Sequence, residues 1–299
     1  MGSVMFHTPV LLGEIINFLE SVYVNNNFVF IDCTLGEGGH SGAILRKYEN
    51  INVIGIERDD IILSRAKESL VEFRDRISYF NAWFDDFFSE CPLSTKPNFI
   101  LADLGISMFH YKMSGRGFSL LEDERLDMRL NPDSGGISAY EVVNDFSRER
   151  LENLIYEFGG EHYSRRIVKS ILEYRETQKI STTGELRNII NKAYPRVRLK
   201  INPATKTFQA LRIYVNDELF RLRRSLPLWV ESLAEGGVLA IITFHSLEDK
   251  IVKEYFKSLD KDSYCVLTKK PIIPSLKEKR CNNASRSAKL RAIKNRWAK

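Results

Sequence analysis

Hydrophobic and polar residues alternate along the first third of the chain in a pattern that predicts strands and helices in turn. Short apolar runs predict buried strands, and longer stretches with apolar residues three or four positions apart predict helices. The predicted strands are 28–32, 52–57, 77–80 and 98–103. The predicted helices are 9–20, 41–48 and 60–73. Strands that alternate with helices are typical of a parallel sheet covered on both faces, so we expect an α/β fold.

The middle of the chain has a different pattern. From about residue 111 to 202 the strand signal is almost absent, and apolar residues recur at helical spacing. Several of these segments begin at Ser, Thr or Asp, which commonly cap the first turn of a helix. The predicted helices are 138–145, 147–158, 161–177 and 182–193. An all-helical insertion into the α/β domain is therefore expected.

The α/β pattern resumes after this helical stretch. We expect a long helix, a shorter helix, a buried strand and a further helix at 208–226, 228–233, 237–243 and 247–256. The residues beyond 258 predict a final strand or two. The chain thus divides into a first part of the core at 1–110, a helical insertion at 111–203 that we expect to bind RNA, and a second part of the core at 204–299 with a basic tail.

Length and composition place the chain among ordinary globular proteins. It has 299 residues, of which 43% are hydrophobic and 28% charged, enough for one large domain or two ordinary ones. No apolar run approaches the roughly 18 residues that a membrane span requires. The cysteines show no close pairing and the five histidines no ligand spacing, so we expect no disulfide framework, no metal site and a reducing, cytoplasmic setting. The cysteines are Cys33, Cys91, Cys265 and Cys281.

Charge is distributed unevenly along the chain. The segment 261–299 holds twelve Lys and Arg against two acids, whereas the preceding 260 residues hold 32 bases and 37 acids. A basic tail on a mildly acidic body indicates a polyanionic partner, with nucleic acid as the first candidate. The alternative is a solvated terminus with little order, and charge alone leaves the two open.

Three predicted strands end in acidic residues, at the edge where open parallel sheets bind their ligands. These acids are Asp32, Glu57 and Asp103, and a glycine turn follows the first of them. Glycines let the backbone approach a ligand closely, and an acid at the next strand end can accept hydrogen bonds from both hydroxyls of a ribose. The alternative is an ordinary strand-to-helix turn. The candidate ligand residues of the turn are Gly36, Gly38, Gly39 and His40.

Two cofactors suit this pattern, a dinucleotide and S-adenosylmethionine. Dinucleotide-binding turns usually space their glycines Gly-x-Gly-x-x-Gly, and here the third small residue is displaced. Glu37 would also repel a pyrophosphate, whereas Asp32, four residues before the first glycine, suits the cationic amino-acid end of S-adenosylmethionine. The sequence therefore favours S-adenosylmethionine as the cofactor and, with it, methyl transfer.

Eight short motifs spread along the chain match one known family. They lie at 7–12, 36–41, 103–107, 116–119, 126–129, 202–213, 244–249 and 283–291. On these motifs the chain resembles the bacterial 16S rRNA N4-cytosine methyltransferases, the RsmH or MraW family. The resemblance implies a Rossmann-like class I S-adenosylmethionine-dependent methyltransferase core with an inserted all-helical domain. It also implies methylation of the exocyclic N4 of one cytidine in the decoding centre of 16S rRNA. The small ribosomal subunit is the expected partner, and the sequence leaves open whether the substrate is free rRNA or the assembled subunit.

The family's cofactor contacts, carried over by motif, fall on the glycine turn and on the strand ends. His110 stands where the family usually has glutamine, and an imidazole can still donate one hydrogen bond. Glu57 stands where the family usually has aspartate and keeps the carboxylate, and Asn202 replaces a histidine. For Phe84 the simpler alternative is a core aromatic. The implied contacts are Gly38, Gly39, His40, Glu57, Phe84, Asp103 and His110.

Asp103 and His245 are the candidate catalytic residues. The cytosine amine is a poor nucleophile because its lone pair is delocalised, and an acceptor that holds its N–H groups favours attack on a methyl group. We expect Asp103 and the carbonyls after it to form such a cradle, although Asp103 can also serve the cofactor alone. His245 follows a buried strand and can line the cytidine pocket. The structural interpretation of this motif is that Ser246 caps the next helix and Asp249 completes a capping box.

Basic residues near the end of the helical insertion, together with the tail, indicate a track for RNA. They are Arg196, Arg198, Lys200, Lys206 and Arg212. The alternative for Arg212 is an ion pair with a neighbouring acid, and Asp127 and Arg129 can form an internal ion pair. Two rival functions are a nucleic-acid binder without activity, which the intact acid and glycine set disfavours, and a dinucleotide-dependent dehydrogenase, which should show a second mononucleotide-binding half. The oligomeric state is left open.

Overall fold

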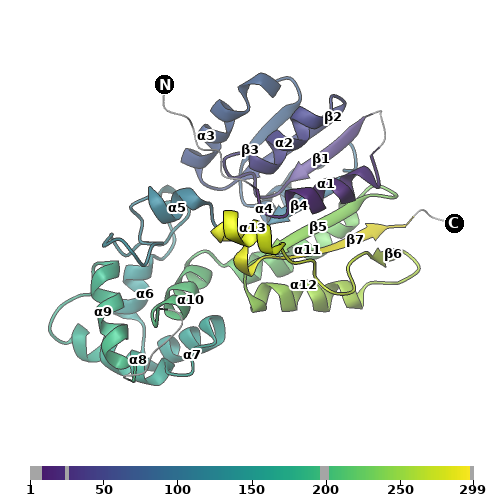
Figure 1. Cartoon of the computed structure of the whole chain (residues 1–299). Helices are drawn as coiled ribbons and strands as arrows, with labels where there is room; N and C mark the ends of the chain where they lie inside the picture. Colours follow the sequence, from purple (N-terminus) through teal and green to yellow (C-terminus); the bar gives the residue numbers. More distant parts are fainter. Residues whose placement is uncertain (1–8, 24–26, 196–201, 297–299) are drawn as a thin grey trace. The chain divides into compact units, whose positions relative to one another are not determined.

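A computed structural model describes residues 9–23, 27–195 and 202–296 of the chain (Figure 1). The chain divides into two compact units. Unit 1 is formed by Met1–Ile106 together with Leu219–Lys299, and unit 2 by Ser107–Glu218. Within the described residues, every helix is too short or too polar to span a lipid bilayer.

Unit 1 is built on a seven-stranded sheet with the strand order β3-β2-β1-β4-β5-β7-β6 (Figure 1). The strands from β3 to β5 are parallel, whereas β7 is antiparallel to both β5 and β6. The chain order reverses between β1 and β4, and ligands bind at such a switch point in open α/β sheets. The strands are β1 (Phe28–Asp32), β2 (Ile51–Glu57), β3 (Ile77–Asn81), β4 (Phe99–Asp103), β5 (Val238–Thr243), β6 (Tyr264–Val266) and β7 (Lys289–Asn295).

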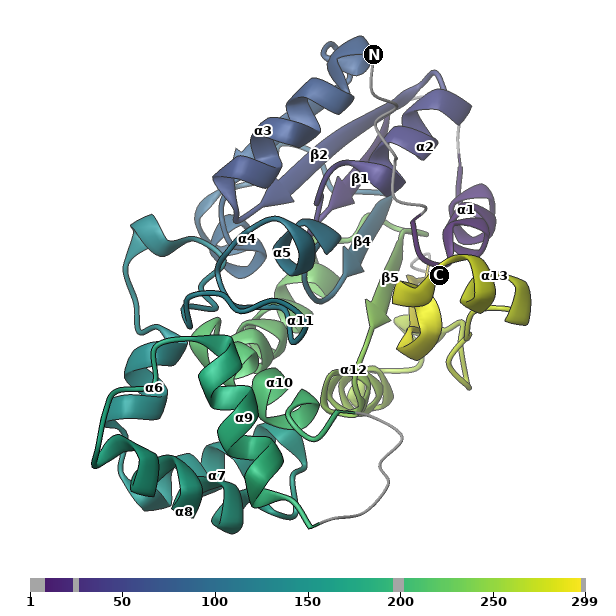
Figure 2. The same cartoon turned by 60° about the vertical axis from the view of Figure 1, so that its left-hand side comes forward.

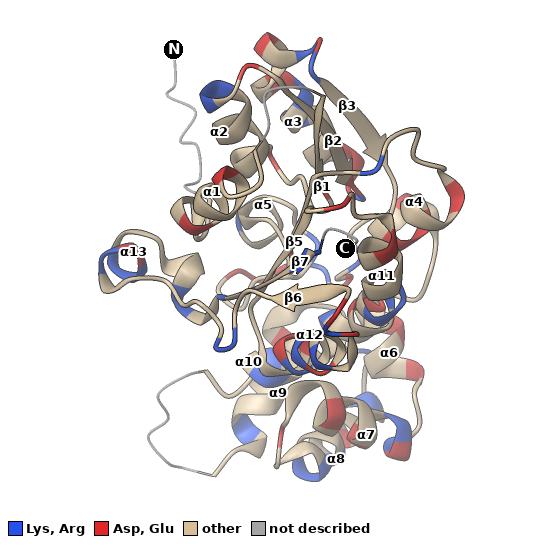
Figure 3. Cartoon of the chain, turned by 90° about the vertical axis from the view of Figure 1, so that its right-hand side faces the viewer, with Lys and Arg blue, Asp and Glu red and all other residues tan. Residues whose placement is uncertain are grey.

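Helices cover both faces of this sheet because alternate strand residues are apolar on each side. Phe28 and Phe30 of β1 join one core cluster with side chains from α1, α2 and α3, while Ile31 is buried toward the other face. Figure 3 shows α4 and α11 on the side of the strands opposite α1 and α2. The helices of unit 1 are α1 (Leu12–Glu20), α2 (Gly39–Lys47), α3 (Asp60–Ser69), η1 (Val71–Phe73), α4 (Phe84–Glu90), α11 (Glu218–Ser232, from its second residue), α12 (Ser246–Ser258), α13 (Leu276–Cys281) and η3 (Asn283–Ser287).

The Rossmann-like α/β architecture predicted from the sequence is confirmed by this topology. Each predicted strand is present with its ends shifted by no more than one residue, and the final strand or two expected beyond 258 are β6 and β7. The tail from 261 to 296 is therefore ordered structure rather than a solvated terminus. Its strands differ from the rest of the sheet in direction, since they form the antiparallel edge.

The prediction of one long helix at 208–226 followed by a short one at 228–233 is wrong. The structure has α10 (Thr205–Val215) and α11, with the break at 216–217. The Asn216 amide donates to the carbonyl of Met128 and its oxygen accepts from the N–H of Leu130, and Asp217 adopts a left-handed φ of 50°. α11 then continues through Pro227, although proline removes one intrahelical hydrogen bond, because buried side chains on both sides of it hold the helix in place.

Unit 2 is helical in its described residues, with one isolated β-bridge between Arg125 and Thr182. Ser138 and Thr182 cap α6 and α9 through complete capping boxes, as their positions in the sequence predict. Figure 2 shows α6 to α10 gathered in one bundle. The helices are α5 (Met108–Lys112), η2 (Pro132–Ser134), α6 (Ala139–Asp145), α7 (Arg148–Gly159), α8 (Ser164–Arg175), α9 (Thr183–Ala193) and α10.

The unit boundary after the insertion differs from the expected one at 203, because α10 belongs to unit 2. α10 packs along α7, and the approach is closest at Gly159, where an added Cβ would lie 2.6 Å from the carbonyl oxygen of Lys206. Only glycine fits this crossing without a shift of the backbone. The helical insertion therefore ends at Glu218, and the core resumes with α11.

Candidate active site

The turn after β1 is held in a shape that glycine alone adopts without strain. Gly38 has φ +85° and forms the N-cap of α2. A Cβ at Gly38 would lie 2.6 Å from Cδ1 of Leu70, so both the backbone conformation and the available space require glycine here. The backbone of this turn is thus available for close approach by a ligand at the carboxyl end of the sheet.

Asp32 lies buried beneath the turn at the end of β1. Its Oδ2 accepts a 2.7 Å hydrogen bond from the Ser41 hydroxyl, and its Oδ1 accepts from the N–H of Thr34 at 3.3 Å. Burial raises the pKa of Asp32 to about 6, and these two hydrogen bonds oppose the rise. The carboxylate therefore gains from any cation that a ligand brings to it.

Glu57, at the end of β2, holds the glycine turn from the neighbouring strand. Its Oε2 accepts a 3.0 Å hydrogen bond from the N–H of Gly36, and its Oε1 accepts a 2.8 Å bond from the N–H of Asp59. Burial raises the pKa of Glu57 to about 7, against these backbone bonds. Glu57 also accepts a backbone hydrogen bond from Arg58. A carboxylate offers about four acceptor sites, so Glu57 can position the turn and still receive a hydroxyl group.

Asp103 ends β4 on the other side of β1. Its backbone N–H donates to the Thr34 hydroxyl at 2.7 Å, and its Oδ2 lies 3.7 Å from Nδ1 of His40. Oδ1 is buried without a hydrogen-bond partner among the residues that the structure describes. Burial, with the charges of Asp32 and Glu248, raises the pKa of Asp103 well above its usual range. The structure therefore brings Asp32, His40 and Asp103 together and leaves one carboxylate oxygen available to a donor group.

Phe84 begins α4, and its ring packs into the core from one side. The ring centroid lies 5.3 Å from that of the fully buried Trp229. α4 is fixed there by Asp85, which is completely buried and lies 2.6 Å from Arg221 and 3.4 Å from Arg224 of α11. This network was not apparent in the sequence, because its members are more than 130 residues apart. Phe84 itself is half-buried, and its contact with a cofactor stays a prediction.

His110 lies in α5 of unit 2. Its ring is buried and packs edge-on against Phe118, with the ring centroids 5.1 Å apart. The side chain is therefore fixed by local packing, and its predicted contact with a cofactor stays a prediction.

The capping interpretation of the motif after β5 is wrong in its residues. The N-cap of α12 is His245 rather than Ser246, and the capping box is completed by Glu248 rather than Asp249. Nδ1 of His245 accepts from the N–H of Glu248 at 3.4 Å, and Glu248 accepts from the backbone N–H groups of Phe244 and His245. His245 thus has a structural role. It follows β5, which pairs in parallel with β4, so its ring lies at the same edge of the sheet as Asp103.

The Asp249 carboxylate instead forms ion pairs with two basic residues of the tail. Its carboxylate lies 2.7 Å from Nε of Arg291 and 3.1 Å from Nζ of Lys289, both from β7. Burial alone would raise the pKa of Asp249, but the hydrogen bonds and charges of Arg291 and Lys289 outweigh it and lower the pKa. Part of the positive charge of the tail is therefore paired with an acidic residue inside the fold.

Several basic residues of the expected RNA track are also engaged within unit 2. The ion-pair alternative for Arg212 is confirmed, since its Nε lies 2.8 Å from Glu218. Lys206 donates to the carbonyl of Gly160. The expected ion pair between Asp127 and Arg129 is present within unit 2, with two 2.8 Å bonds. Arg196, Arg198 and Lys200 lie outside the described residues.

Comparison with known proteins shows the family of the chain. A family model described as the MraW methylase family matches residues 4–296. A protein from Borrelia hermsii named "Ribosomal RNA small subunit methyltransferase H" is 78% identical over 98% of this chain and 99% of its own length. A protein of the same name from Borreliella burgdorferi strain ZS7 is 60% identical with the same coverage. Among solved structures, an rRNA methylase from Streptococcus thermophilus has a TM-score of 0.46 and 9% identity, covering 94% of this chain and 93% of its own.

Proposed function

Since the chain belongs to the MraW methylase family, we propose that it transfers a methyl group from S-adenosylmethionine to N4 of one cytidine in the decoding centre of 16S rRNA. The full-length relatives named as small-subunit rRNA methyltransferases support rRNA of the small subunit as the substrate. The cytidine and its N4 rest on the family motifs in the sequence. The assignment of S-adenosylmethionine as the donor rests on one observation. Three carboxylates, those of Asp32, Glu57 and Asp103, lie at one edge of the sheet.

The residues present suit this donor in chemistry and in shape. Asp32 is a buried carboxylate without a cationic partner in the described residues, and a donor with a cationic amino-acid end would supply one. The turn from Gly36 to His40 offers backbone at close approach, and Glu57 offers a free acceptor site for a ribose hydroxyl. The buried, unpartnered Oδ1 of Asp103 requires a donor group that the described residues do not provide.

S-adenosylmethionine supplies, when bound, an electrophilic methyl group on a sulfonium. The task of the protein is to align the acceptor amine and to hold its N–H groups. Asp103 does this through the carboxylate whose Oδ1 is buried and unpaired, because an oxygen that is already desolvated accepts an amine N–H at little further cost. Phe84 lines the donor site, and His245 lies on the acceptor side.

The raised pKa of Asp103 bears on proton movement. An amine that has gained a methyl group must lose a proton, and a carboxylate of raised pKa beside His40 can receive it and pass it on. Asp103 thus combines a hydrogen-bond acceptor with a proton acceptor. The helical unit 2 is the part we assign to RNA, and the cytoplasm, where ribosomal subunits assemble, is the setting.

Hydride transfer with a dinucleotide is disfavoured by the second half of the sheet. Dinucleotide-binding folds repeat a parallel mononucleotide-binding half beyond the switch point. Here β7 and β6 are antiparallel, so the strands of residues 27–195 and 202–296 form no second half of that kind.

Methyl incorporation tests the proposed function. Small subunits from cells that lack the enzyme are incubated with the protein and methyl-labelled S-adenosylmethionine, and the modified nucleotide is mapped by nuclease digestion and mass spectrometry. We expect one N4-methylcytidine per subunit, and almost none with Asp103→Ala. Label on another base, or no label with an enzyme that binds S-adenosylhomocysteine, would refute the substrate while leaving the donor site intact.

A further inference from the structure

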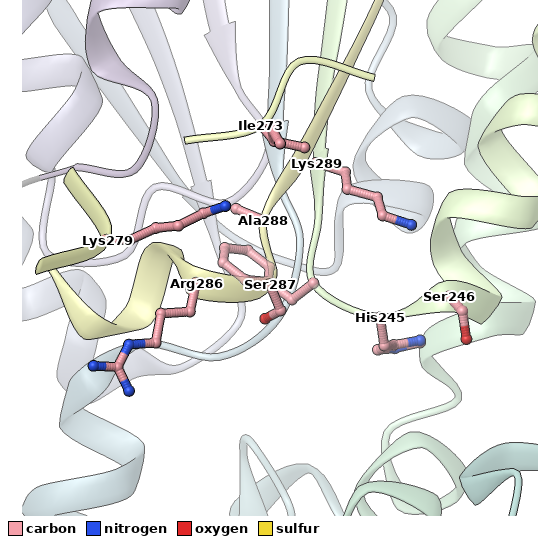
Figure 4. Close-up of a pocket in the computed structure, with 9 residues that line it drawn as sticks. His245, Ser246, Ile273, Lys279, Arg286, Ser287, Ala288 and Lys289 are labelled. Atoms are coloured by element: carbon pink, nitrogen blue, oxygen red, sulfur yellow. The ribbon is translucent and has the colours of Figure 1, made fainter. Parts of the chain in front are cut away.

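A pocket of about 330 Å³ opens in unit 1 between the end of β5 and the segment that precedes β7. Figure 4 shows Lys279 and Arg286 on one side of it and Lys289 and His245 on the other, with Ser287 between them. Phe244 and Ile273 supply its apolar wall. The pocket thus combines cationic and hydroxyl groups with a flat apolar surface, a mixture that suits a phosphate joined to a sugar or base.

The pocket carries an excess of positive charge. None of the described residues that line it is acidic. Lys289 shares the single carboxylate of Asp249 with Arg291, so one negative charge faces two positive ones. In the part of the chain that the structure describes, Lys279 and Arg286 make no ion pair. Figure 3 shows basic residues on α13, the helix that carries Lys279.

The pocket adjoins the loop that follows Asp103. A Cβ built on Gly105 would lie 3.4 Å from the ring of Phe244, which also lines the pocket. The α13 segment is tied to the same edge of the sheet, because Glu278 accepts a 2.8 Å hydrogen bond from the N–H of Leu11, and the neighbouring carbonyl of Val10 lies 2.9 Å from Nε2 of His40. The cations are therefore held next to the residues that we assign to the acceptor amine.

We propose that this pocket binds a backbone phosphodiester of the RNA substrate beside the target nucleotide. The proposal rests on the proposed function, since it names the part of the substrate that fixes the position of the cytidine. Arg286 and Lys279 form charge-assisted bonds to the phosphate oxygens, Ser287 donates its hydroxyl, and Phe244 with Ile273 packs against the sugar. Contacts to phosphate fix register on a nucleic acid without reading its sequence.

The test compares two double variants that remove the same charge from the same segment. Lys279→Ala with Arg286→Ala removes the pocket cations, whereas Lys277→Ala with Arg280→Ala removes exposed cations of α13 that do not line the pocket. Affinity for 16S rRNA is measured by fluorescence anisotropy across a salt series. We expect the pocket variant to lose at least tenfold in affinity and to reduce the slope of log Kd against log salt by about 0.7, the value for one phosphate contact. The matched variant loses less than threefold, as expected for general charge alone.

A second pair of variants guards against loss of structure. Ser287→Asp places a negative charge inside the pocket, and Asn283→Asp places the same charge on η3 outside it. We expect Ser287→Asp alone to weaken RNA binding strongly, with S-adenosylhomocysteine affinity unchanged in both variants. Equal losses within either pair, or no loss in the pocket variants, would overturn the proposal. A different result separates the two proposals. If RNA binding depends on the pocket but the wild-type enzyme transfers no methyl group, the proposed function is refuted and the proposal for the pocket is upheld.

Discussion

Nδ1 of His40 lies 3.7 Å from Oδ2 of Asp103, while Nε2 of the same ring lies 2.9 Å from the carbonyl oxygen of Val10. Because a carbonyl only accepts, Nε2 carries a proton, and a neutral ring presents Nδ1 to the carboxyl group as an acceptor. The raised pKa of Asp103 favours a proton on that carboxyl group. His40 is therefore placed to take up or return the proton of Asp103 during a reaction.

Asp103→Ala should lower kcat at saturating donor by about 100-fold or more, the usual contribution of a positioned acid–base group. S-adenosylhomocysteine affinity, measured by calorimetry, should change by less than tenfold, because Asp32 and Glu57 remain. Asp103→Asn keeps one acceptor oxygen and should retain more activity than the alanine variant. Full turnover by Asp103→Ala with intact cofactor affinity would show that Asp103 does not hold the amine.

The raised pKa of Asp32 predicts that its contribution to stability falls as the pH rises. Its pKa is raised from 3.8 to about 6 in the folded protein, so the native state binds more protons than the unfolded chain in that interval. This contribution is complete below about pH 4 and is lost as the pH rises through 6, by about 3 kcal/mol for a shift of this size. Asp32→Asn, whose amide can donate to Ser41, should therefore gain in free energy of unfolding relative to wild type between about pH 4 and pH 8.

The same carboxylate should make donor binding depend on pH in the opposite direction. A cationic amino-acid end favours the ionised form of Asp32, so S-adenosylhomocysteine should bind more tightly as the pH rises through 6. Asp32→Asn should bind weakly at every pH. A wild-type affinity that stays constant from pH 5 to pH 7, titrated by calorimetry, would mean that Asp32 does not face the charged end.

Two substitutions at His245 can separate its role as the N-cap of α12 from a contact with the substrate. His245→Ala should lower the free energy of unfolding by about 1 kcal/mol, because α12 loses its N-cap, and His245→Asn should restore it. If the ring also contacts the acceptor, the asparagine variant should keep a KM for small subunits raised about tenfold, the equivalent of one hydrogen bond of roughly 1.5 kcal/mol. Recovery of both stability and KM in His245→Asn would limit His245 to capping.

Replacing glycine by alanine should change the stability in opposite directions at two helical positions. At Gly159, alanine would bring Cβ to 2.6 Å from a carbonyl oxygen of α10 and should destabilise unit 2 by about 1–3 kcal/mol. At Gly13 in α1, nothing lies within 4 Å of an added Cβ, and alanine should stabilise by up to about 1 kcal/mol. Urea unfolding of both variants tests the crossing of α7 and α10. Equal effects would show that the crossing relaxes without cost.

Local pattern was sufficient for most of the fold. The strands could be found because apolar runs of five to seven residues end in chemically distinct positions such as Asp32, Glu57 and Asp103. The break between α10 and α11 could not be found, because it depends on the contact of Asn216 with a segment more than 80 residues away. The apolar pattern continues through it, and Pro227 offered a more obvious place for the break.

The sequence was sufficient to predict those residues of the candidate site that directly follow a strand. It was not sufficient for contacts between residues that are far apart in the sequence. His245-x-x-Glu248 and Ser246-x-x-Asp249 have the same spacing, and only the end of β5 decides which pair caps α12. Lys279 and Arg286 appeared in the sequence only as part of a charge count, since nothing local relates them to Phe244. Asp249 illustrates the same limit, because its partners come from β7.

The sheet of unit 1 is assembled from both sides of an insertion, and this constrains how the chain folds as it is made. β4 pairs with β1 early in synthesis, but its other edge pairs with β5, whose first residue lies 135 positions after Asp103, the last residue of β4. Until then an apolar strand presents open hydrogen-bonding groups, a state prone to aggregation. Unit 2 is continuous in sequence and can form during that interval. A nascent chain stalled before Val238 should therefore recruit chaperones far more than one stalled after Asn295.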